Sequence, residues 1–352
     1  MVERKLSSFD KTMDYNDKKS VCIKNLRFPL MLGVVLIHNR IIEPSAAFNE
    51  GFLFLGLFID VFSQKLVASC VPLFFFFSGY LFFVKYADGF SANDYFNQLR
   101  KRMRTLLVPF IFWNAIVMGY FALIHKFAPE IINSEFNNVY HFSVVDFIRS
   151  FWDFPNGQPI CYQFWFLRDL ILMVVLSPII YWLLKSSKWY LLSVLAVLYV
   201  INPETFLHQT SITFFMLGAG FAIHKYDFVI FAEKCRIIAM PLFLFCIILS
   251  SGGGVKGILT ISGALTLIYI ATLFNASRCI YTKSGFFVYA FHGFPILILS
   301  RVIVMVFQPS NSIMWLICYL LDFFVITFLS IFLYLILRKI FPNFTAIITG
   351  GR

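Results

Sequence analysis

Long apolar runs, separated by short polar connections, dominate the sequence and predict its fold. Four of these runs are nearly free of charged residues: Leu106–Leu123, Leu170–Leu184, Ile237–Leu249 and Ile317–Leu337. A membrane-spanning helix needs about 20 predominantly apolar residues, and shorter stretches suffice when their flanking residues reach the membrane interface. The pattern therefore predicts an all-α, polytopic integral membrane protein.

We predict about ten transmembrane helices, with both termini in the cytoplasm. The predicted spans are 26–43, 59–84, 105–125, 165–184, 189–202, 208–224, 236–250, 256–275, 284–305 and 313–338. The first span contains Arg27 and His38, which the apolar core of a signal peptide would not contain. The corresponding parts of the chain are a cytoplasmic N-terminal segment, a transmembrane domain and a cytoplasmic tail: residues 1–25, 26–340 and 341–352.

Composition and charge agree with a membrane protein. Hydrophobic residues make up 60% of the chain and charged residues 13%, whereas soluble domains carry about 25% charged residues. The net charge of +11 does not indicate nucleic-acid binding, because the basic residues form short clusters between the apolar runs. Most of them fall in the connections assigned to the cytoplasm, as the positive-inside rule requires. The 7 cysteines are scattered singly, so we expect packing roles and no metal site.

Arg27 and His38 are the most informative polar residues of the first span. Ionisable groups inside a bilayer cost about 2.5–3.5 kcal/mol each and are therefore candidates for function. Eleven helical residues return to within about 20° of the starting direction, so both side chains share one face, about 16 Å apart along the axis. Leu30, Met31 and Val34 complete this stripe. The alternative is structural: Arg27 snorkels to lipid phosphates, and His38 bonds a neighbouring helix.

Other polar and small residues fall at similar depths. His292 lies about 13 Å from Lys283 along its helix, and Ser78 lies about 10 Å from Lys85. Ser78-Gly79 and Gly218-Ala219-Gly220 either allow close helix packing or leave room for a ligand. A structural role for His292 is also open.

Two further groups lie near the predicted membrane surfaces. Arg100-Lys101-Arg102-Met103-Arg104 is a topology signal, and it would also supply a phosphate site beside Arg27. Trp165, Arg168 and Asp169 begin the fourth span. They are either interface anchors or a sugar-binding group.

Six segments, in order along the chain, carry a resemblance to a known family. They are Asn25-Leu26-Arg27 with ten residues before His38, Val71-Pro72-Leu73-Phe74-Phe75-Phe76-Phe77-Ser78-Gly79-Tyr80, Lys101-x-x-Arg104 before Leu107-Val108-Pro109, Trp165-Phe166-Leu167-Arg168-Asp169-Leu170 with Ser177-Pro178, Phe214-Phe215-Met216-Leu217-Gly218, and Val288-Tyr289-Ala290-Phe291-His292. The sequence resembles the acyltransferase-3 family, membrane acyltransferases of bacterial surface glycans. It departs from the family pattern at Lys101, where arginine is usual.

The resemblance implies transfer of an acyl group, usually acetyl, from cytoplasmic acyl-CoA to a sugar hydroxyl. The expected donor is acetyl-CoA, the expected acceptor is a surface polysaccharide or a lipid-linked glycan, and the expected location is the bacterial cytoplasmic (inner) membrane. Which acyl group and which sugar are used, and the oligomeric state, stay open.

The candidate residues can be arranged into a hypothetical mechanism. Arg27, Lys101 and Arg104 would hold the CoA phosphates, and His38 would act as general base or form an acyl-imidazole. His292, Ser78 or Asn114 would orient His38 or stabilise the oxyanion. Trp165, Arg168 and Asp169 would face the acceptor. The alternatives are a secondary transporter or glycan-lipid flippase, or a structural membrane subunit.

Overall fold

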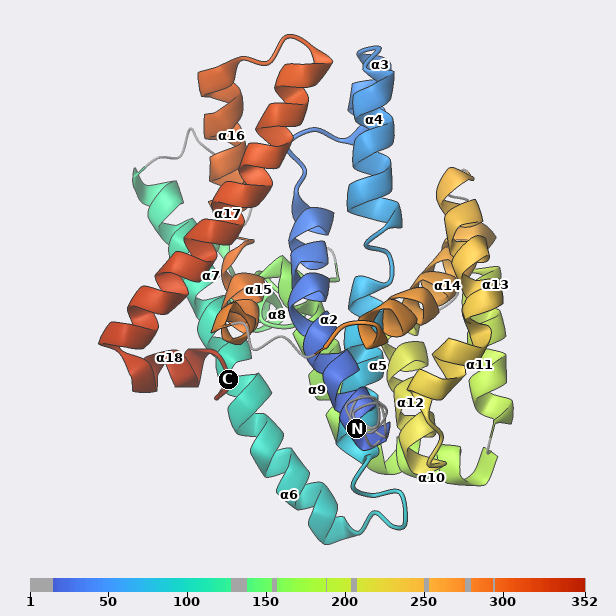
Figure 1. The fold of residues 1–352 in the computed structure, drawn as a ribbon. Coiled ribbons are helices and arrows are strands. Elements are labelled where there is room, and N and C mark those ends of the chain that lie inside the picture. The colour runs from blue at the N-terminus through green and yellow to red at the C-terminus, as the bar shows by residue number, and fades with distance from the viewer. Residues whose placement is uncertain are drawn as a thin grey trace, which may run out of the picture.

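The computed structural model describes residues 15–127, 138–153, 157–187, 189–203, 208–249, 253–275, 280–293 and 295–351. This part of the chain is helical throughout, and no β-strand occurs in it (Figure 1). The first 14 residues and Arg352 lie outside the described residues, so the cytoplasmic placement of both termini stays a prediction.

The helices follow one another with short connections. The first part of the chain forms α2 (Tyr15–His38), α3 (Pro44–Asn49), α4 (Leu53–Ile59), the π-helix η1 (Asp60–Lys65), α5 (Cys70–Phe83), α6 (Ala92–Arg102), the π-helix η2 (Met103–Leu107), α7 (Val108–Phe127), the 3₁₀-helix η4 (Val139–His141) and α8 (Val144–Ser150). The rest forms the 3₁₀-helix η5 (Tyr162–Phe164), α9 (Trp165–Val175), α10 (Ser177–Ser187), α11 (Tyr190–Ile201), α12 (Gln209–Ile223), α13 (Phe228–Ile248), α14 (Gly253–Thr272), the 3₁₀-helix η6 (Ile280–Ser284), α15 (Gly285–Phe291), α16 (Pro295–Phe307), α17 (Ser312–Ile340) and α18 (Pro342–Ile348).

Each predicted span coincides with a helix or a pair of helices, which supports a multi-pass membrane protein. Among the described residues, five helical segments are long and apolar enough to cross a membrane, or up to seven if each of two bent pairs is one span. Helices α11 and α12 are apolar but shorter. The number of ten spans therefore stays a prediction.

Two predicted spans are not single straight helices. The 165–184 span bends by 67° between α9 and α10, and the 284–305 span bends by 77° between α15 and α16. Proline lies at both breaks, as Pro178 and Pro295. Because proline lacks an N–H and disfavours helical backbone at the preceding residue, each apolar run is divided.

The ends of the chain also differ from the predicted division. Helix α2 begins at Tyr15 instead of residue 26 and ends at His38 instead of residue 43. The predicted tail contains α18, whose Ile348 is buried and accepts a hydrogen bond through its carbonyl from Trp113 Nε1 at 3.0 Å. Residues 342–348 are therefore packed against α7, and the cytoplasmic location of this segment stays a prediction.

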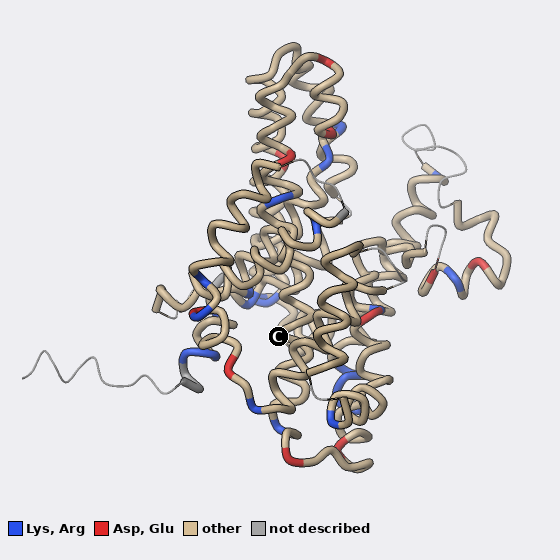
Figure 2. The backbone as a smooth tube through the Cα atoms, turned by 90° about the vertical axis from the view of Figure 1, so that its right-hand side faces the viewer, with Lys and Arg blue, Asp and Glu red and all other residues tan. Residues whose placement is uncertain are grey.

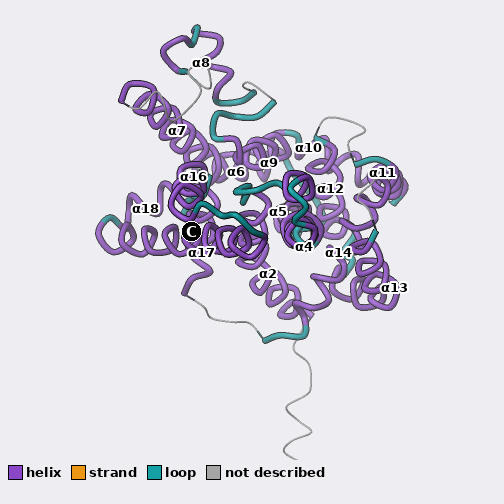
Figure 3. Tube along the Cα trace, turned by 90° about the horizontal axis from the view of Figure 1, so that it is seen from above, coloured by secondary structure: helices purple, strands orange, loops and turns teal. Residues whose placement is uncertain are grey.

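Helices α2 and α5 lie centrally, with α11, α13 and α14 on one side and α7, α16 and α17 on the other (Figures 1 and 3). The most extensive helix contact joins α5 to α12. A Cβ atom at Gly79 would overlap the carbonyl oxygen of Phe215, and one at Gly218 would overlap that of Phe76. These two glycines therefore allow the backbones of α5 and α12 to approach closely. Of the two roles predicted for them, close helix packing or room for a ligand, the structure supports close packing.

Substitution of Gly218 by alanine is expected to lower the stability by about 1–3 kcal/mol, because the new methyl group must push α5 and α12 apart. Thermal unfolding of the purified protein in detergent measures the effect. Gly119→Ala in α7 is the matched control, because nothing lies within 4 Å of its added Cβ. The control should be neutral or slightly stabilising, since alanine favours helix over glycine. Equal stability of the two variants would contradict the close-packing role.

Lys and Arg are unevenly distributed along the long axis of the molecule. They gather toward the lower end in Figure 2, and fewer of them mark the upper end. This is the distribution that the positive-inside rule predicts for the cytoplasmic end.

Candidate functional site

One face of α2 lines a cavity of about 110 Å³ that extends from Arg27 to His38. Met31 and Val34 line it between these two residues, so the shared helical face predicted from their spacing is confirmed. Leu30 is buried in the core and does not line the cavity. Arg27 is exposed, which leaves its guanidinium accessible at the surface.

Helices α5, α9 and α15 supply the remaining walls. Ser78 and Trp165, two of the predicted site residues, line the cavity together with His38. Most of the other lining side chains are apolar: Val71, Phe74, Phe77, Phe166, Leu170 and Phe286 among them. An apolar cavity with a few polar groups is typical of a ligand-binding site.

His38 lies between two other rings. Its ring centroid is 5.4 Å from that of His292 and 5.0 Å from that of Tyr162. His292 is fully buried, and its Nδ1 lies 3.1 Å from the carbonyl oxygen of Val288. A carbonyl only accepts, so Nδ1 carries the hydrogen and Nε2 is left as an acceptor. This buried Nε2 has no hydrogen-bond partner. The structure therefore brings two imidazoles together, one of which presents an unused acceptor.

Tyr162 and Gln163 belong to the site but were not predicted from sequence. Gln163 lines the cavity and donates from Nε2 to the carbonyl of Ala290 at 3.1 Å. The Tyr289 hydroxyl donates to the carbonyl of Gln163 at 2.7 Å. These bonds fasten the segment before α9 to α15. The sequence signal that could have identified Tyr162 and Gln163 was their position just before the motif that begins at Trp165.

Asn114 holds the same segment from the other side. Its Oδ1 accepts from the backbone N–H of Cys161 at 3.1 Å, and its Nδ2 donates to the carbonyl of Phe110 at 2.8 Å. Asn114 does not line the cavity. The side chain predicted as a partner of His38 therefore positions the backbone beside Tyr162 instead.

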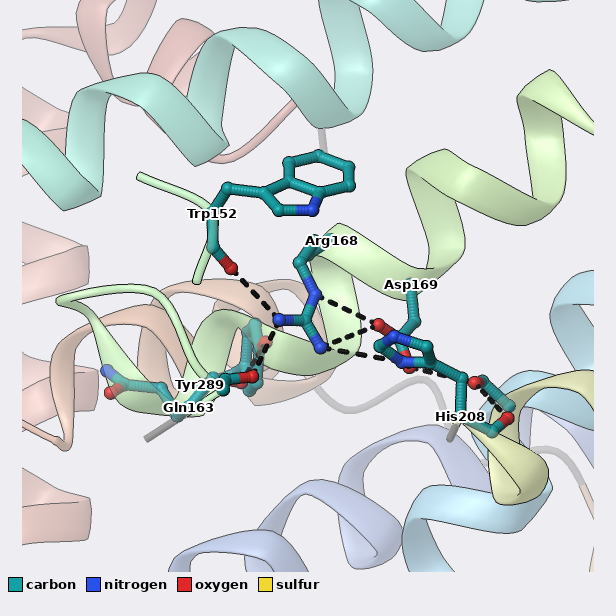
Figure 4. Close-up of polar contacts among 8 residues, drawn as sticks. Trp152, Gln163, Arg168, Asp169, His208 and Tyr289 are labelled. Atoms are coloured by element: carbon teal, nitrogen blue, oxygen red, sulfur yellow. Dashed lines mark hydrogen bonds and ion pairs between the residues drawn. The ribbon is translucent and has the colours of Figure 1, made fainter. Parts of the chain in front are cut away.

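Arg168 and Asp169 form a buried polar network instead of facing the cavity (Figure 4). Arg168 donates from Nε and Nη2 to Asp169 Oδ1 at 3.1 and 3.0 Å, and from Nη1 to the carbonyls of Trp152 and Gly157 at 2.9 and 2.8 Å. Asp169 Oδ2 lies 2.8 Å from His208 Nδ1 and accepts from Ser211 Oγ at 2.8 Å. These bonds join the connection before α9 to the start of α12. Binding of an acceptor sugar by Arg168 and Asp169 stays a prediction.

Lys101 and Arg104, the other predicted phosphate ligands, are exposed and do not line the cavity. Arg102, which lies between them, places its guanidinium 5.9 Å from the centre of the Phe82 ring. Of the three predicted phosphate-binding residues, only Arg27 is thus brought to the cavity that contains His38.

Comparison with known proteins gives two findings. The family model described as an acyltransferase domain, that of the acyltransferase-3 family, matches residues 21–349. The chain is also similar to the succinoglycan biosynthesis protein ExoH of Rhizobium meliloti (strain 1021), with 22% identity over 364 residues, 95% of this chain and 92% of that protein. No solved structure matches the chain.

Proposed function

Because the chain belongs to the acyltransferase-3 family, we propose that it transfers an acyl group from cytoplasmic acyl-CoA to a hydroxyl of a surface glycan or its lipid-linked precursor. The observation that carries the proposal is that Arg27 and His38 line the same cavity. The similarity to ExoH, a succinoglycan biosynthesis protein, supports a glycan acceptor. We propose acetyl as the acyl group and the bacterial inner membrane as the location.

The shape of the cavity suits a donor that has a charged head and a narrow arm. Coenzyme A carries phosphates at one end and a thiol on a long, uncharged arm. The exposed guanidinium of Arg27 would bind a phosphate by charge-assisted hydrogen bonds. The nucleotide would stay outside, at the exposed Arg27, and the arm with its acyl group would extend along the cavity toward His38. The axial distance of about 16 Å between the two residues suits such an arm.

The proposed chemistry needs one base near the thioester. A ring nitrogen of His38 takes the proton of the acceptor hydroxyl, whose oxygen attacks the thioester carbonyl. The carbon–sulfur bond then breaks, and the imidazolium returns the proton to the leaving thiolate. His292, whose ring lies 5.4 Å from that of His38 but does not line the cavity, would orient the His38 ring, and Ser78 would donate to the oxyanion. In the covalent variant, a ring nitrogen of His38 attacks the thioester carbonyl and expels the CoA thiolate; the acceptor hydroxyl then attacks the acyl-imidazole, the carbon–nitrogen bond breaks, and the released ring nitrogen takes the hydroxyl proton.

Mass spectrometry of surface glycans from cells with and without this protein tests the function. We expect a mass difference of one acyl unit on the glycan. Membranes that contain the protein should also transfer a labelled acyl group from acetyl-CoA, with succinyl-CoA as the competing donor. A glycan that moves across the membrane but keeps its mass would instead show a transporter or flippase.

Replacement of Arg27 by alanine is expected to raise the KM for acyl-CoA about tenfold or more, because a hydrogen bond to a charged group contributes about 1.5–3 kcal/mol. Initial rates at varied acyl-CoA concentration measure this effect. Lys24→Ala is the control, since Lys24 is exposed on the same helix but does not line the cavity. A KM unchanged by Arg27→Ala would contradict phosphate binding at this end of the cavity.

A further inference from the structure

A second cavity, of about 680 Å³, lies between α5, α11, α12, α13 and α14. It has no lining residue in common with the His38 cavity. Helix α5 separates the two cavities, with Leu73 and Phe76 on one face, and Phe74 and Ser78 on the other. The proposed reaction uses none of the residues that line this second cavity.

The floor of this cavity is apolar and enclosed. Leu73, Leu192, Phe214 and Phe228 line it and are buried in the core. Ser193 also lines it but is exposed, so the cavity reaches the surface at α11. Its volume lies within the range of about 300–1,000 Å³ that is typical of sites for small organic ligands. An apolar space that is open to the surface suits a hydrocarbon chain.

The polar end of the cavity resembles a membrane interface. Trp189 and Tyr226 line this end and pack with their ring centroids 4.9 Å apart. Such aromatic residues are enriched at headgroup level. Lys225, next to Tyr226 in the chain, and Lys234, further along α13, also line the cavity. The apolar space is thus continuous with an amphipathic, cationic mouth.

The two lysines are available to an anion. Lys225 pairs with Asp88, but both side chains are largely exposed, and an exposed pair of this kind is weak. Lys234 is exposed as well. The third charged lining residue, Asp227, accepts from the backbone N–H of Val229 and Ile230 and pairs with Lys19 at 3.4 Å. Its carboxylate is therefore occupied, and the charge left at the mouth is positive.

We propose that this cavity holds an anionic phospholipid of the surrounding leaflet, with one acyl chain on the apolar floor and its phosphate between Lys225 and Lys234. The headgroup would lie beside Trp189 and Tyr226. This site is independent of the proposed acyl transfer, because α5 separates it from Arg27 and His38. The lipid would fill the space between α12 and α13 and so stabilise the side of the protein remote from the catalytic cavity.

Native mass spectrometry of the purified full-length protein tests the proposal, with phosphatidylglycerol and phosphatidylcholine as probes. We expect phosphatidylglycerol to remain bound and to raise the unfolding temperature, and phosphatidylcholine to do neither. Each lysine near an anionic headgroup contributes about fivefold in affinity, so Lys225→Gln with Lys234→Gln should weaken binding about 25-fold. Lys339→Gln, which removes an exposed charge elsewhere, is the control.

A bulky side chain tests the apolar part separately. Ser193→Trp should fill the cavity and prevent phosphatidylglycerol binding, whereas Val194→Trp, on the exposed face of the same helix, should not. Equal retention of both lipids, or wild-type retention by Ser193→Trp and by the double lysine variant, would overturn the proposal. Retention of an isoprenoid phosphate in place of the phospholipid would also overturn it.

Discussion

Replacement of His38 by alanine is expected to abolish acyl transfer. A general base contributes a factor of about 10²–10⁴ to the rate, so kcat/KM should fall by at least this factor. No other described side chain has the same position, because His38 lies at the end of the cavity that begins at Arg27. Transfer of a labelled acyl group from acyl-CoA to the glycan measures the loss. Thermal unfolding of the variant should match that of the wild-type protein, which separates lost chemistry from lost folding.

The same variant distinguishes the two forms of the mechanism. Incubation with labelled acyl-CoA in the absence of acceptor should label the wild-type protein only if an acyl-imidazole forms, and His38→Ala should carry no label. His292→Ala should reduce transfer less than His38→Ala, since His292 is proposed to orient the His38 ring rather than to take the proton of the hydroxyl. Full activity of His38→Ala would reject both forms.

Asp169→Ala is expected to lower the stability by about 3–5 kcal/mol, because it leaves the buried guanidinium of Arg168 without its counter-charge. It also removes the acceptor used by His208 and Ser211. The change in the free energy of unfolding, measured by denaturation of the detergent-solubilised protein, gives the magnitude.

An exposed ion pair supplies the control for Asp169. Asp88 pairs with Lys225 at the surface, where both side chains are largely exposed, so Asp88→Ala should change the stability little. A raised KM for the acceptor glycan at unchanged stability of Asp169→Ala would contradict the structural role. It would instead support the sugar-binding role predicted for this residue.

The sequence was sufficient to predict the helices and one face of the site. Each apolar run predicted as a span contains a helix in the structure, because a bilayer imposes a minimum length on apolar segments, whereas the number of ten spans stays a prediction. The helical period placed Arg27 and His38 on one face, and both line the same cavity. Local periodicity is sufficient here because α2 is continuous from Tyr15 to His38 despite its internal Pro29.

Features that depend on contacts between distant segments were not predictable in this way. Hydropathy locates an apolar segment but does not indicate the direction of its helix axis, so the bends after α9 and α15 were not predicted. The contact of Tyr162 with His38 joins an irregular connection to the end of α2, and no periodic pattern encodes it. The sequence also did not indicate the partners of Arg168, because the carbonyls of Trp152 and Gly157 that accept its hydrogen bonds are backbone atoms of a loop.

The end of α2 at His38 bears on the electrostatics of the proposed reaction. The last carbonyls of a helix lack intrahelical donors and carry the negative end of its dipole. His38 lies in this last turn. When it takes the hydroxyl proton, the ring becomes a cation next to that negative end, which stabilises positive charge by up to about 2 kcal/mol in partly buried sites. The helix that lines the arm of the donor would thus also offset part of the cost of forming the imidazolium in a desolvated cavity.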